Sequence, residues 1–449
     1  MNPFKEYLTN SYYRPSNILE SLLAYFLEIF YTKKSKTFSE KTFIKKRIPS
    51  SVTYYNFLGR LIYVFINFLL IIIFNRIFDR SLVVEENEAK KDFIKKERLT
   101  ISKGSDSHIW PTSYLDVREK DVNNKNFPEK NYFNDISESY KISLEDLDKN
   151  SITDAEFWKK CRSEFQSYFF DKSQNLIAEN IKNFKNINFN FSANLLKFEK
   201  NIINPESRKN KMESILMVNF YHKLSNFIDL DVLRTASDNY AGNGNCMVYR
   251  NQRLNYRILR QSYFFSQLKK NIDLKKSDKN IFLDIGGGYG GLLRFLKHHY
   301  KNSVGILIDL PEVCCFAAYY LKSCFPESKI GMVKDFKNID KIGTEELKNY
   351  DFVILNQASL KKFEKNIIDM AINTVSLGEM NEKDQDYYIE QIERVTKRYF
   401  YSVNRPKRGK LKFKLDGFYD FKLSPKLWDT KVYKFNHTFH LEFLGEKVS

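Results

Sequence analysis

The sequence predicts an α/β domain built on a mostly parallel sheet with a closing antiparallel hairpin, preceded by an α-helical cap and an N-terminal extension. Three observations support this prediction. The apolar run Ile281–Ile285 breaks into five glycines within six positions and then into a helical pattern. Up to residue 403, strand-like runs then alternate with helical patterns, as in successive βαβ units. Finally, Val432–Leu444 has the pattern of a hairpin.

The first hundred residues form an extension of unusual composition. The run Ile18–Tyr31 is largely apolar, and Lys33–Arg47 holds seven basic residues against one acidic, a net charge of +6. The run Leu61–Phe74 has Asn67 as its one polar residue. A bilayer span needs about 20 apolar residues. We therefore expect residues 18–78 to contact a membrane surface without spanning it; a helical hairpin packed on the rest of the protein explains the pattern equally well.

The composition limits the class of protein. A chain of 449 residues suggests two or three units, which we place at residues 1–100, 101–275 and 276–449. The net charge of +18 favours an anionic partner, although a general bias toward lysine contributes to it. The five cysteines and six histidines show no metal-ligand spacing, so we expect no metal. The start of the chain lacks the pattern of a signal peptide. We therefore expect a cytoplasmic protein with reduced thiols, located peripherally on a membrane.

Residues 101–275 are expected to form a mainly helical cap. The segment Ile101–Ser151 is polar and turn-rich. Helical patterns follow at Leu176–Phe184, Ile215–Leu233 and Leu254–Ile272. The small, amide-rich loop Ser237–Asn245 makes Tyr240 and Asn243 candidate substrate-binding residues, while an ordinary surface turn explains the same composition.

The glycine-rich turn carries the main chemical signal. Gly286, Gly288 and Gly291 spell G-x-G-x-x-G, which can hold a dinucleotide. Asp284, however, lies two residues earlier at the end of the strand, where it would face a pyrophosphate. A cofactor with a cationic head suits this position better, and Asp-x-Gly-x-Gly-x-Gly is the pattern of enzymes that use S-adenosylmethionine. The candidate cofactor-binding residues of this segment are Asp284, Gly286, Gly287, Gly288, Tyr289 and Gly290.

Two later strands end in polar residues that suit the rest of such a cofactor. Val304–Ile308 ends at Asp309, followed by Leu310, and a carboxylate at this point can accept both ribose hydroxyls. An acid at the start of the next helix is the structural alternative. Phe352–Leu355 ends at Asn356 and Gln357, which we expect at the edge of the adenine; Asn373, after the following strand, completes the predicted cofactor residues.

The loop after the strand Asp369–Asn373 is the expected place for catalysis. Transfer of a methyl group to a hydroxyl needs a group that removes the proton. Glu379 is the candidate base, and Ser376 and Asn373 are candidates for positioning the hydroxyl. An acid near a helix N-terminus is the alternative for Glu379. His437 and His440 are reserve bases.

A basic segment follows the last helix. Arg394–Lys414 contains nine basic residues and no acidic one. Such a segment can hold the diphosphate of a nucleotide sugar or a lipid-linked saccharide, which makes Arg405 a candidate substrate-binding residue. A solvated loop accounts for it equally well.

Four motifs in the order of the chain resemble a bacterial family of sugar O-methyltransferases. They are Asp284-Ile-Gly-Gly-Gly-Tyr-Gly-Gly291, Ile308-Asp-Leu-Pro-Glu-Val313, Ile372-Asn-Thr-Val-Ser-Leu-Gly-Glu-Met380 and Tyr399-Phe-Tyr-Ser-Val-Asn-Arg405. The resemblance covers roughly residues 235–445. It implies a Rossmann-like class I methyltransferase fold, S-adenosylmethionine as cofactor, and a sugar, nucleotide-sugar or lipid-linked saccharide acceptor in surface polysaccharide synthesis.

Three other functions are open on sequence grounds. A nucleic-acid methyltransferase fits the charge, but the Asn-Thr-Val-Ser loop lacks the Pro-Pro-aromatic pattern that stacks a flipped base, and we expect no specific nucleic acid. A nicotinamide enzyme is disfavoured by Asp284 and by the lack of a Tyr-x-x-x-Lys pair. A non-catalytic, membrane-associated protein with a degenerate methyltransferase domain is disfavoured by the intact glycine turn and Asp309.

Overall fold

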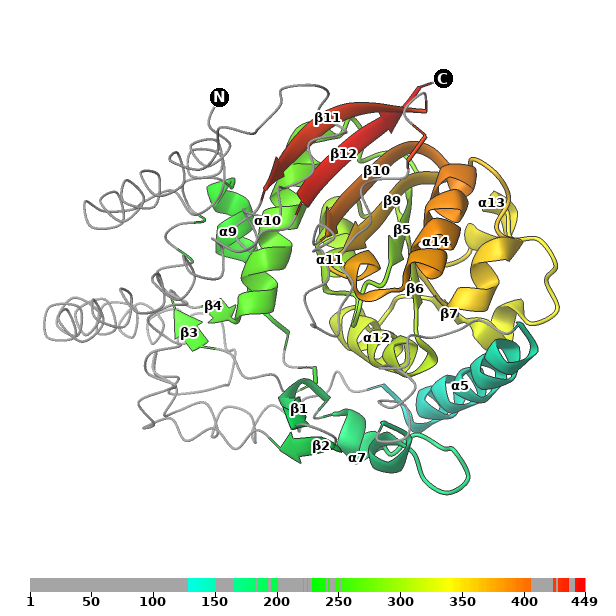
Figure 1. Cartoon of the computed structure of the whole chain (residues 1–449). Helices are drawn as coiled ribbons and strands as arrows, with labels where there is room; N and C mark the ends of the chain where they lie inside the picture. Colours follow the sequence, from blue (N-terminus) through cyan, green and yellow to red (C-terminus); the bar gives the residue numbers. More distant parts are fainter. Residues whose placement is uncertain are drawn as a thin grey trace, which may run out of the picture.

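A computed structural model of the chain (Figure 1) describes the region that contains the glycine turn. The described residues are 128–150, 165–182, 184–192, 195–200, 221, 224, 228–239, 241–242, 247–249, 252–404, 423–424, 427–435 and 441–448. The N-terminal extension, with the segment that we expect to contact a membrane, lies outside the described residues. The same is true of Tyr240, Asn243, Arg405, His437 and His440. Within the described residues, no helix has the length and apolar character that crossing a membrane requires.

An eight-stranded sheet forms the centre of the molecule, in the order β11-β12-β10-β9-β5-β6-β8-β7 (Figure 1). The strands are β5 Ile281–Ile285, β6 Val304–Asp309, β7 Ile330–Met332, β8 Phe352–Asn356, β9 Ile368–Thr374, β10 Thr396–Asn404, β11 Trp428–Phe435 and β12 Leu441–Lys447. Strands β5 to β10 pair in parallel, while β12 is antiparallel to both β10 and β11. The predicted Rossmann-like sheet with a closing antiparallel hairpin is confirmed.

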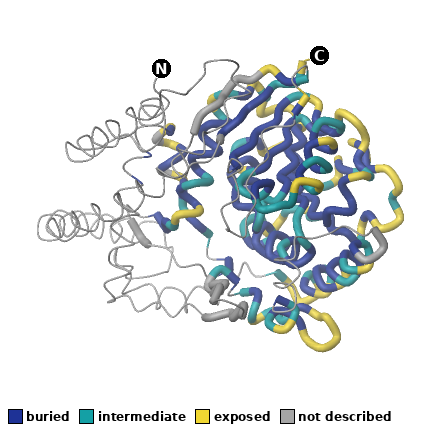
Figure 2. Tube along the Cα trace, viewed as in Figure 1, coloured by how far each residue is buried: buried dark blue, intermediate teal, exposed yellow. Residues whose placement is uncertain are grey.

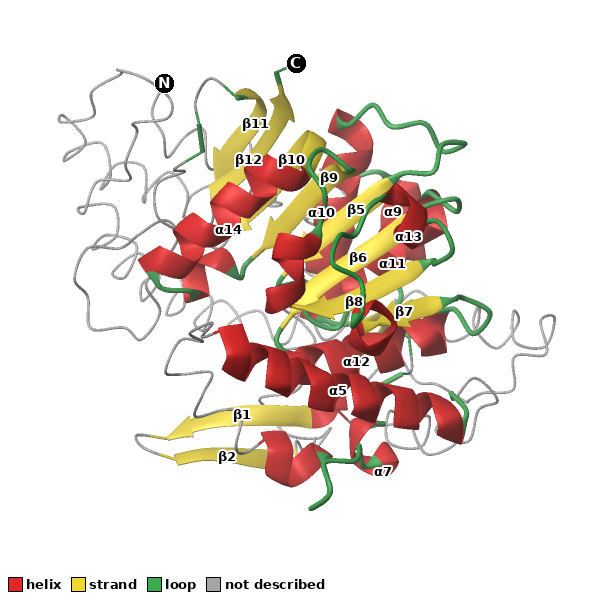
Figure 3. Ribbon diagram, turned by 90° about the vertical axis from the view of Figure 1, so that its right-hand side faces the viewer, coloured by secondary structure: helices red, strands yellow, loops and turns green. Residues whose placement is uncertain are grey.

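Helices cover both faces of this sheet (Figure 3). One face carries α10 Tyr256–Asn271, α11 Gly291–His299 and α12 Pro311–Cys324, with α5 Lys130–Asn150 against α12; the other carries α13 Thr344–Leu347 and α14 Glu382–Val395. Short 3-10 helices lie at η3 Phe184–Asn186, η4 Val333–Phe336, η5 Gln357–Lys362 and η6 Leu377–Glu379. Each face has its own apolar core, and the central strands are buried throughout (Figure 2). Burial on both faces explains why these strands read as continuous apolar runs.

For residues 130–150 the expected turn-rich stretch was wrong, because α5 is a helix of 21 residues; residues 101–127 lie outside the described part of the chain. Its buried side alternates large apolar residues such as Phe133 and Tyr140 with buried serines. The hydroxyls of Ser137 and Ser143 donate to the carbonyls four residues earlier, over 2.8 and 2.7 Å. Bonded in this way, serine can be buried in a helix, but it does not count as apolar in a periodicity, so the pattern was missed.

In the part of the cap that the structure describes, one predicted helix is shorter than expected. Between Leu176 and Phe184 the helix is one turn, α7 Ala178–Ile181, and Leu176 instead bridges Phe170. A second short helix is α9 Leu230–Thr235. Two small hairpins are also present: β1 Ile187–Ser192 with β2 Leu195–Lys200, and β3 Met247–Tyr249 with β4 Gln252–Leu254. The division of the chain at residues 100 and 275 stays a prediction.

Helix α10 joins the cap to the sheet and confirms the predicted helix at Leu254–Ile272 to within two residues at the start. Asn255 caps it by accepting a hydrogen bond from the Ile258 N–H at 2.9 Å. Farther along, the Tyr263 hydroxyl donates to the buried carboxylate of Glu442 on β12 at 2.7 Å. The helix is therefore fixed at its start and at its middle before the chain enters β5.

Candidate active site

The glycine turn connects β5 to α11 and takes a conformation that side chains rarely adopt. Gly286, Gly288 and Gly290 have φ of 69°, 60° and 82°. Gly290 is the N-cap of α11, and the Gly286 N–H donates to the Ile308 carbonyl at 2.8 Å, which ties the turn to β6. The left-handed backbone accounts for glycine at three of the five positions.

Packing separates one of these glycines from the other four. A Cβ would overlap Ser376 Oγ at Gly286, Asp284 Oδ2 at Gly287, Leu321 Cδ1 at Gly290 and the Gln261 amide at Gly291. At Gly288 a Cβ would meet no atom within 4 Å. At these four positions a side chain would force its neighbour to move, whereas the turn opens to free space at Gly288.

Asp284 lies directly beneath this turn and is 1% exposed. Neither of its carboxyl oxygens has a hydrogen-bond partner among the described residues. Burial, and secondarily the charge of Asp309, raises the pKa of Asp284 to about 8. A buried carboxyl group without a partner is unfavourable unless a ligand satisfies it. The position therefore calls for a cationic or hydrogen-bond-donating ligand.

Asp309 ends β6 and faces the turn. Its two carboxyl oxygens accept the N–H groups of Gly288 at 2.9 Å and of Leu310 at 2.7 Å. Leu310 is the N-cap of α12, and Asp309 does not bond the N–H groups of the helix's first turn. Burial raises the pKa of Asp309 to about 7 despite these two hydrogen bonds. Its contact with Gly288 places it at the open part of the turn, as the ribose role requires.

Asn356 and Gln357 follow β8 as predicted, and both are buried. The Asn356 side-chain oxygen caps η5, accepting from the Ser359 N–H at 3.1 Å and its hydroxyl at 3.0 Å. Its amide donates to Asp146 on α5 at 3.2 Å. These contacts connect α5 to the sheet, and the proposed place at the adenine edge stays a prediction.

Asn373 and Ser376 bind the loop after β9 to the glycine turn. The Asn373 amide donates to the Ile285 carbonyl at 2.7 Å and to Ser376 Oγ at 2.6 Å, and Ser376 Oγ donates to the same carbonyl at 3.2 Å. The Asn404 amide donates to the Asn373 oxygen at 2.8 Å. The contacts described for both residues are therefore within the protein, where they fix η6 beside the turn; their direct roles toward a ligand stay predictions.

Glu379 ends η6, and its role as the base stays a prediction. Helix α14 has Asn381 as its N-cap, with Asn381 accepting from the Asp384 N–H at 3.0 Å. Glu379 thus precedes the N-cap by two residues. It is half-buried, and its charge contributes to raising the pKa of Asp309. The structure therefore brings Glu379 to the edge of the sheet that holds the glycine turn.

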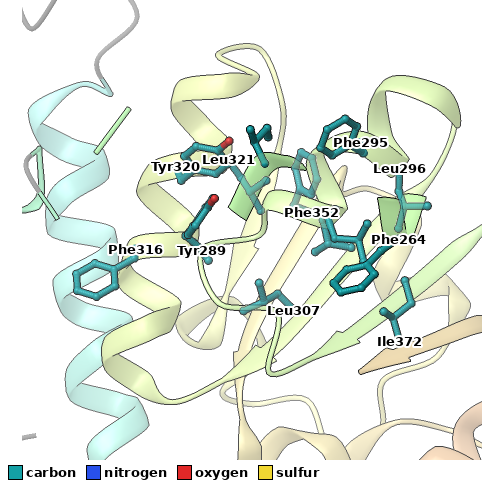
Figure 4. Packing of buried hydrophobic residues seen from close by; sticks show 14 of the residues in the cluster. Phe264, Tyr289, Phe295, Leu296, Leu307, Phe316, Tyr320, Leu321, Phe352 and Ile372 are labelled. Carbon is teal, nitrogen blue, oxygen red and sulfur yellow. The ribbon is translucent and has the colours of Figure 1, made fainter. Parts of the chain in front are cut away.

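The side chain of Tyr289, which belongs to the turn itself, lies close to Tyr320 (Figure 4). Its buried ring lies edge-on to Tyr320, with centroids 4.7 Å apart, and the Lys185 ammonium sits 4.9 Å from its centroid. Tyr289 therefore points into the core between the sheet and the cap. The predicted contact of Tyr289 with a cofactor would therefore have to come from its main chain.

Lys185 belongs to a buried polar cluster that the sequence did not reveal. Its ammonium pairs with Asp238 at 3.0 Å, and Asp238 also accepts from the Tyr320 hydroxyl at 3.3 Å and the Asn255 amide at 2.6 Å. Burial by itself would raise the pKa of Asp238, but Lys185 and Arg294 outweigh it and hold the pKa below its ordinary value. The cluster joins the cap to α10, α11 and α12. No short motif marks it, since Lys185 and Asp238 are 53 residues apart.

Comparison with known proteins adds little to this geometry. No family model matches the chain, and no curated sequence matches it. Among solved structures, a SAM-dependent methyltransferase from Aquifex aeolicus is 15% identical, with a TM-score of 0.26 over 40% of this chain and 88% of the other. Magnesium protoporphyrin IX methyltransferase from Synechocystis, with bound SAH, is 12% identical, with a TM-score of 0.32 over 52% and 99%. An O-methyltransferase family 2 protein from Planctomyces limnophilus is 12% identical, with a TM-score of 0.28 over 42% and 58%. Likeness of this degree says nothing about activity or substrate.

Proposed function

We propose that the protein is an S-adenosylmethionine-dependent O-methyltransferase that acts on a hydroxyl of a sugar or saccharide. The observation that carries this proposal is the buried, unpartnered carboxyl group of Asp284 beneath a turn that opens at Gly288. A dinucleotide would bring two phosphates toward this carboxyl group. S-adenosylmethionine instead brings a cationic amino group and sulfonium, which favour the ionised carboxylate.

The described residues fit this cofactor at two points. Asp284 supplies the anion for its ammonium group. Asp309 lies at the open part of the turn, against the Gly288 N–H, and its carboxylate suits two ribose hydroxyls. Both residues are buried enough that their charges would act strongly on a bound ligand.

When bound, the cofactor supplies an electrophilic methyl group. The protein has to align an acceptor oxygen with it and remove the hydroxyl proton. Glu379 is the group we assign to proton removal, because η6 holds it beside the turn and outside the first turn of α14. Asn373 and Ser376 contribute by fixing the loop that carries it.

The choice of a saccharide rests on the four motifs shared with sugar O-methyltransferases and on charge. A net charge of +18 suits an acceptor that carries phosphate, such as a nucleotide sugar or a lipid-linked saccharide. We propose surface polysaccharide synthesis as the setting. The same charge supports a nucleic-acid acceptor as the competing function.

Transfer of a labelled methyl group from S-adenosylmethionine to saccharide or nucleic-acid acceptors tests the proposal. The label should enter saccharides bearing phosphate and stay absent from RNA and DNA. Glu379→Gln should slow turnover by about 10²–10⁴-fold and leave cofactor affinity near normal. Glu382→Gln, an exposed acid three residues away, is the matched control and should retain turnover.

Two outcomes would contradict these assignments. Label found in nucleic acid and not in saccharide would replace the acceptor class. Near-normal turnover of Glu379→Gln on the true acceptor would remove Glu379 from the mechanism.

A further inference from the structure

Arg260, on the first half of α10, lies beside the glycine turn and has an unsatisfied buried donor. Its Nε is buried and has no hydrogen-bond partner in the described part of the chain. The next residue, Gln261, places its amide against Gly291 at the start of α11. The Arg260 guanidinium also lies 5.9 Å from the centroid of the Phe264 ring, one turn further along α10. The helix therefore carries Arg260 next to the residue that contacts the end of the turn at Gly291.

The surroundings of Arg260 leave its charge incompletely balanced. Burial lowers the pKa of Arg260, and the groups that act on its charge are Tyr256, Arg257, Tyr289 and Glu379. Glu379 is the one carboxylate among these four. An arginine stays protonated in proteins, so burial of its donors without partners is costly. A ligand with an anionic group would satisfy it.

We propose that Arg260 binds the carboxylate of the methionine part of S-adenosylmethionine. The inference rests on the proposed function and extends it to a residue that no sequence motif marks. Two side chains of opposite sign have buried polar atoms without a partner: Asp284 beneath Gly287, and Arg260, which precedes the Gln261 that contacts Gly291. A free α-amino acid group carries an ammonium and a carboxylate on one carbon, so it matches such a pair. Dinucleotides and adenosine lack this group.

The test compares two ligands that differ in this group alone. S-adenosylhomocysteine carries the amino-acid part, whereas 5′-methylthioadenosine lacks it. Titration calorimetry of the full chain should show that Arg260→Ala weakens S-adenosylhomocysteine about 10–100-fold, because a charge-assisted hydrogen bond is lost. Affinity for 5′-methylthioadenosine should stay within about twofold of wild type. Arg260→Lys should recover part of the loss, since it keeps the charge without the planar fork.

Arg257→Ala is the matched control, because it removes the same charge from an exposed position one turn earlier on α10. It should leave the affinity for both ligands within about twofold. Retained binding of 5′-methylthioadenosine shows in each variant that the site is folded.

Three results would overturn the inference. One is an unchanged affinity of Arg260→Ala for S-adenosylhomocysteine; a second is an equal loss for both ligands. The third is an unchanged cofactor affinity with a selective loss of acidic acceptors, which would assign Arg260 to the acceptor. Failure of the wild-type chain to bind S-adenosylhomocysteine would instead refute the proposed function itself, and the inference with it.

Discussion

Two buried aspartates lie on opposite sides of the glycine turn, and they differ in almost everything except burial. Asp238 is 3% exposed and accepts hydrogen bonds from Lys185, Tyr320 and Asn255. Asp284 is 1% exposed and has no partner among the described residues. Their pKa values move in opposite directions, below the ordinary value for Asp238 and up to about 8 for Asp284. The comparison teaches that burial does not define a functional acid; the lack of a partner does.

The largest expected effect concerns the paired side. Asp238→Ala leaves the Lys185 ammonium buried and uncompensated, so the free energy of unfolding should fall by about 3–5 kcal/mol. Denaturant unfolding of the two proteins measures this difference. Asp231→Ala is the control, because Asp231 pairs with Lys269 at 3.5 Å on the surface and its loss should cost less than about 1 kcal/mol. Equal, small effects of the two substitutions would remove the structural role of the cluster.

The unpaired side should respond in the opposite way. Asp284→Asn removes a buried carboxyl group that has no partner to lose, so the stability of the ligand-free protein should be unchanged or higher. Cofactor affinity should fall about 10–100-fold, because the ammonium group loses its counter-charge. Unfolding and titration calorimetry on the same sample separate these effects. A loss of stability as large as that of Asp238→Ala would show that Asp284 is structural.

A smaller effect is expected in the dependence of stability on pH. An unfolded aspartate titrates near pH ~3.9, whereas Asp284 in the folded protein titrates at about 8. Between these values the folded state binds more protons than the unfolded state, so stability falls as the pH rises from about 4 to about 8. Melting temperatures of the ligand-free protein at pH 5.5 and 8 should therefore differ less in Asp284→Asn than in wild type. The remaining slope belongs in part to Asp309, whose pKa is raised to about 7. An identical slope in both proteins would contradict the raised pKa of Asp284.

The parts of the fold that the sequence predicted are those encoded over a few neighbouring residues. Strand β5, the glycine turn and α11 follow one another directly in the sequence. Each of the parallel strands is marked by a short apolar run. Helix α5 escaped prediction because bonded serines such as Ser137 occupy part of its buried side. The pairing of Lys185 with Asp238 depends on how the cap folds onto the sheet, which no local pattern records.

The candidate site shows the same division. Asp284, Asp309 and Glu379 could be proposed because each lies at or just after the end of a strand at the carboxyl edge of a parallel sheet, where such residues converge. Arg260 lies within a helix and belongs to no motif. Its place near the turn depends on the packing of α10 against α11, where Gln261 contacts Gly291. The opposite holds for Asn373 and Ser376, for which the sequence suggested a site role and the structure shows contacts within the protein. Their place at the loop after the strand suggested contact with a ligand, whereas their described hydrogen bonds include those to the Ile285 carbonyl, to each other and, for Asn373, to the Asn404 amide.

The central claim is that the open side of the glycine turn is a site for S-adenosylmethionine. The most direct measurement is titration calorimetry of the full chain with S-adenosylhomocysteine and with NAD, repeated on Gly288→Val. We predict that S-adenosylhomocysteine binds, that NAD does not, and that the substitution abolishes binding, because it fills the space at Gly288 and forces a side chain onto a backbone with φ of 60°. Binding of NAD by the wild-type protein, with no binding of S-adenosylhomocysteine, would contradict the claim.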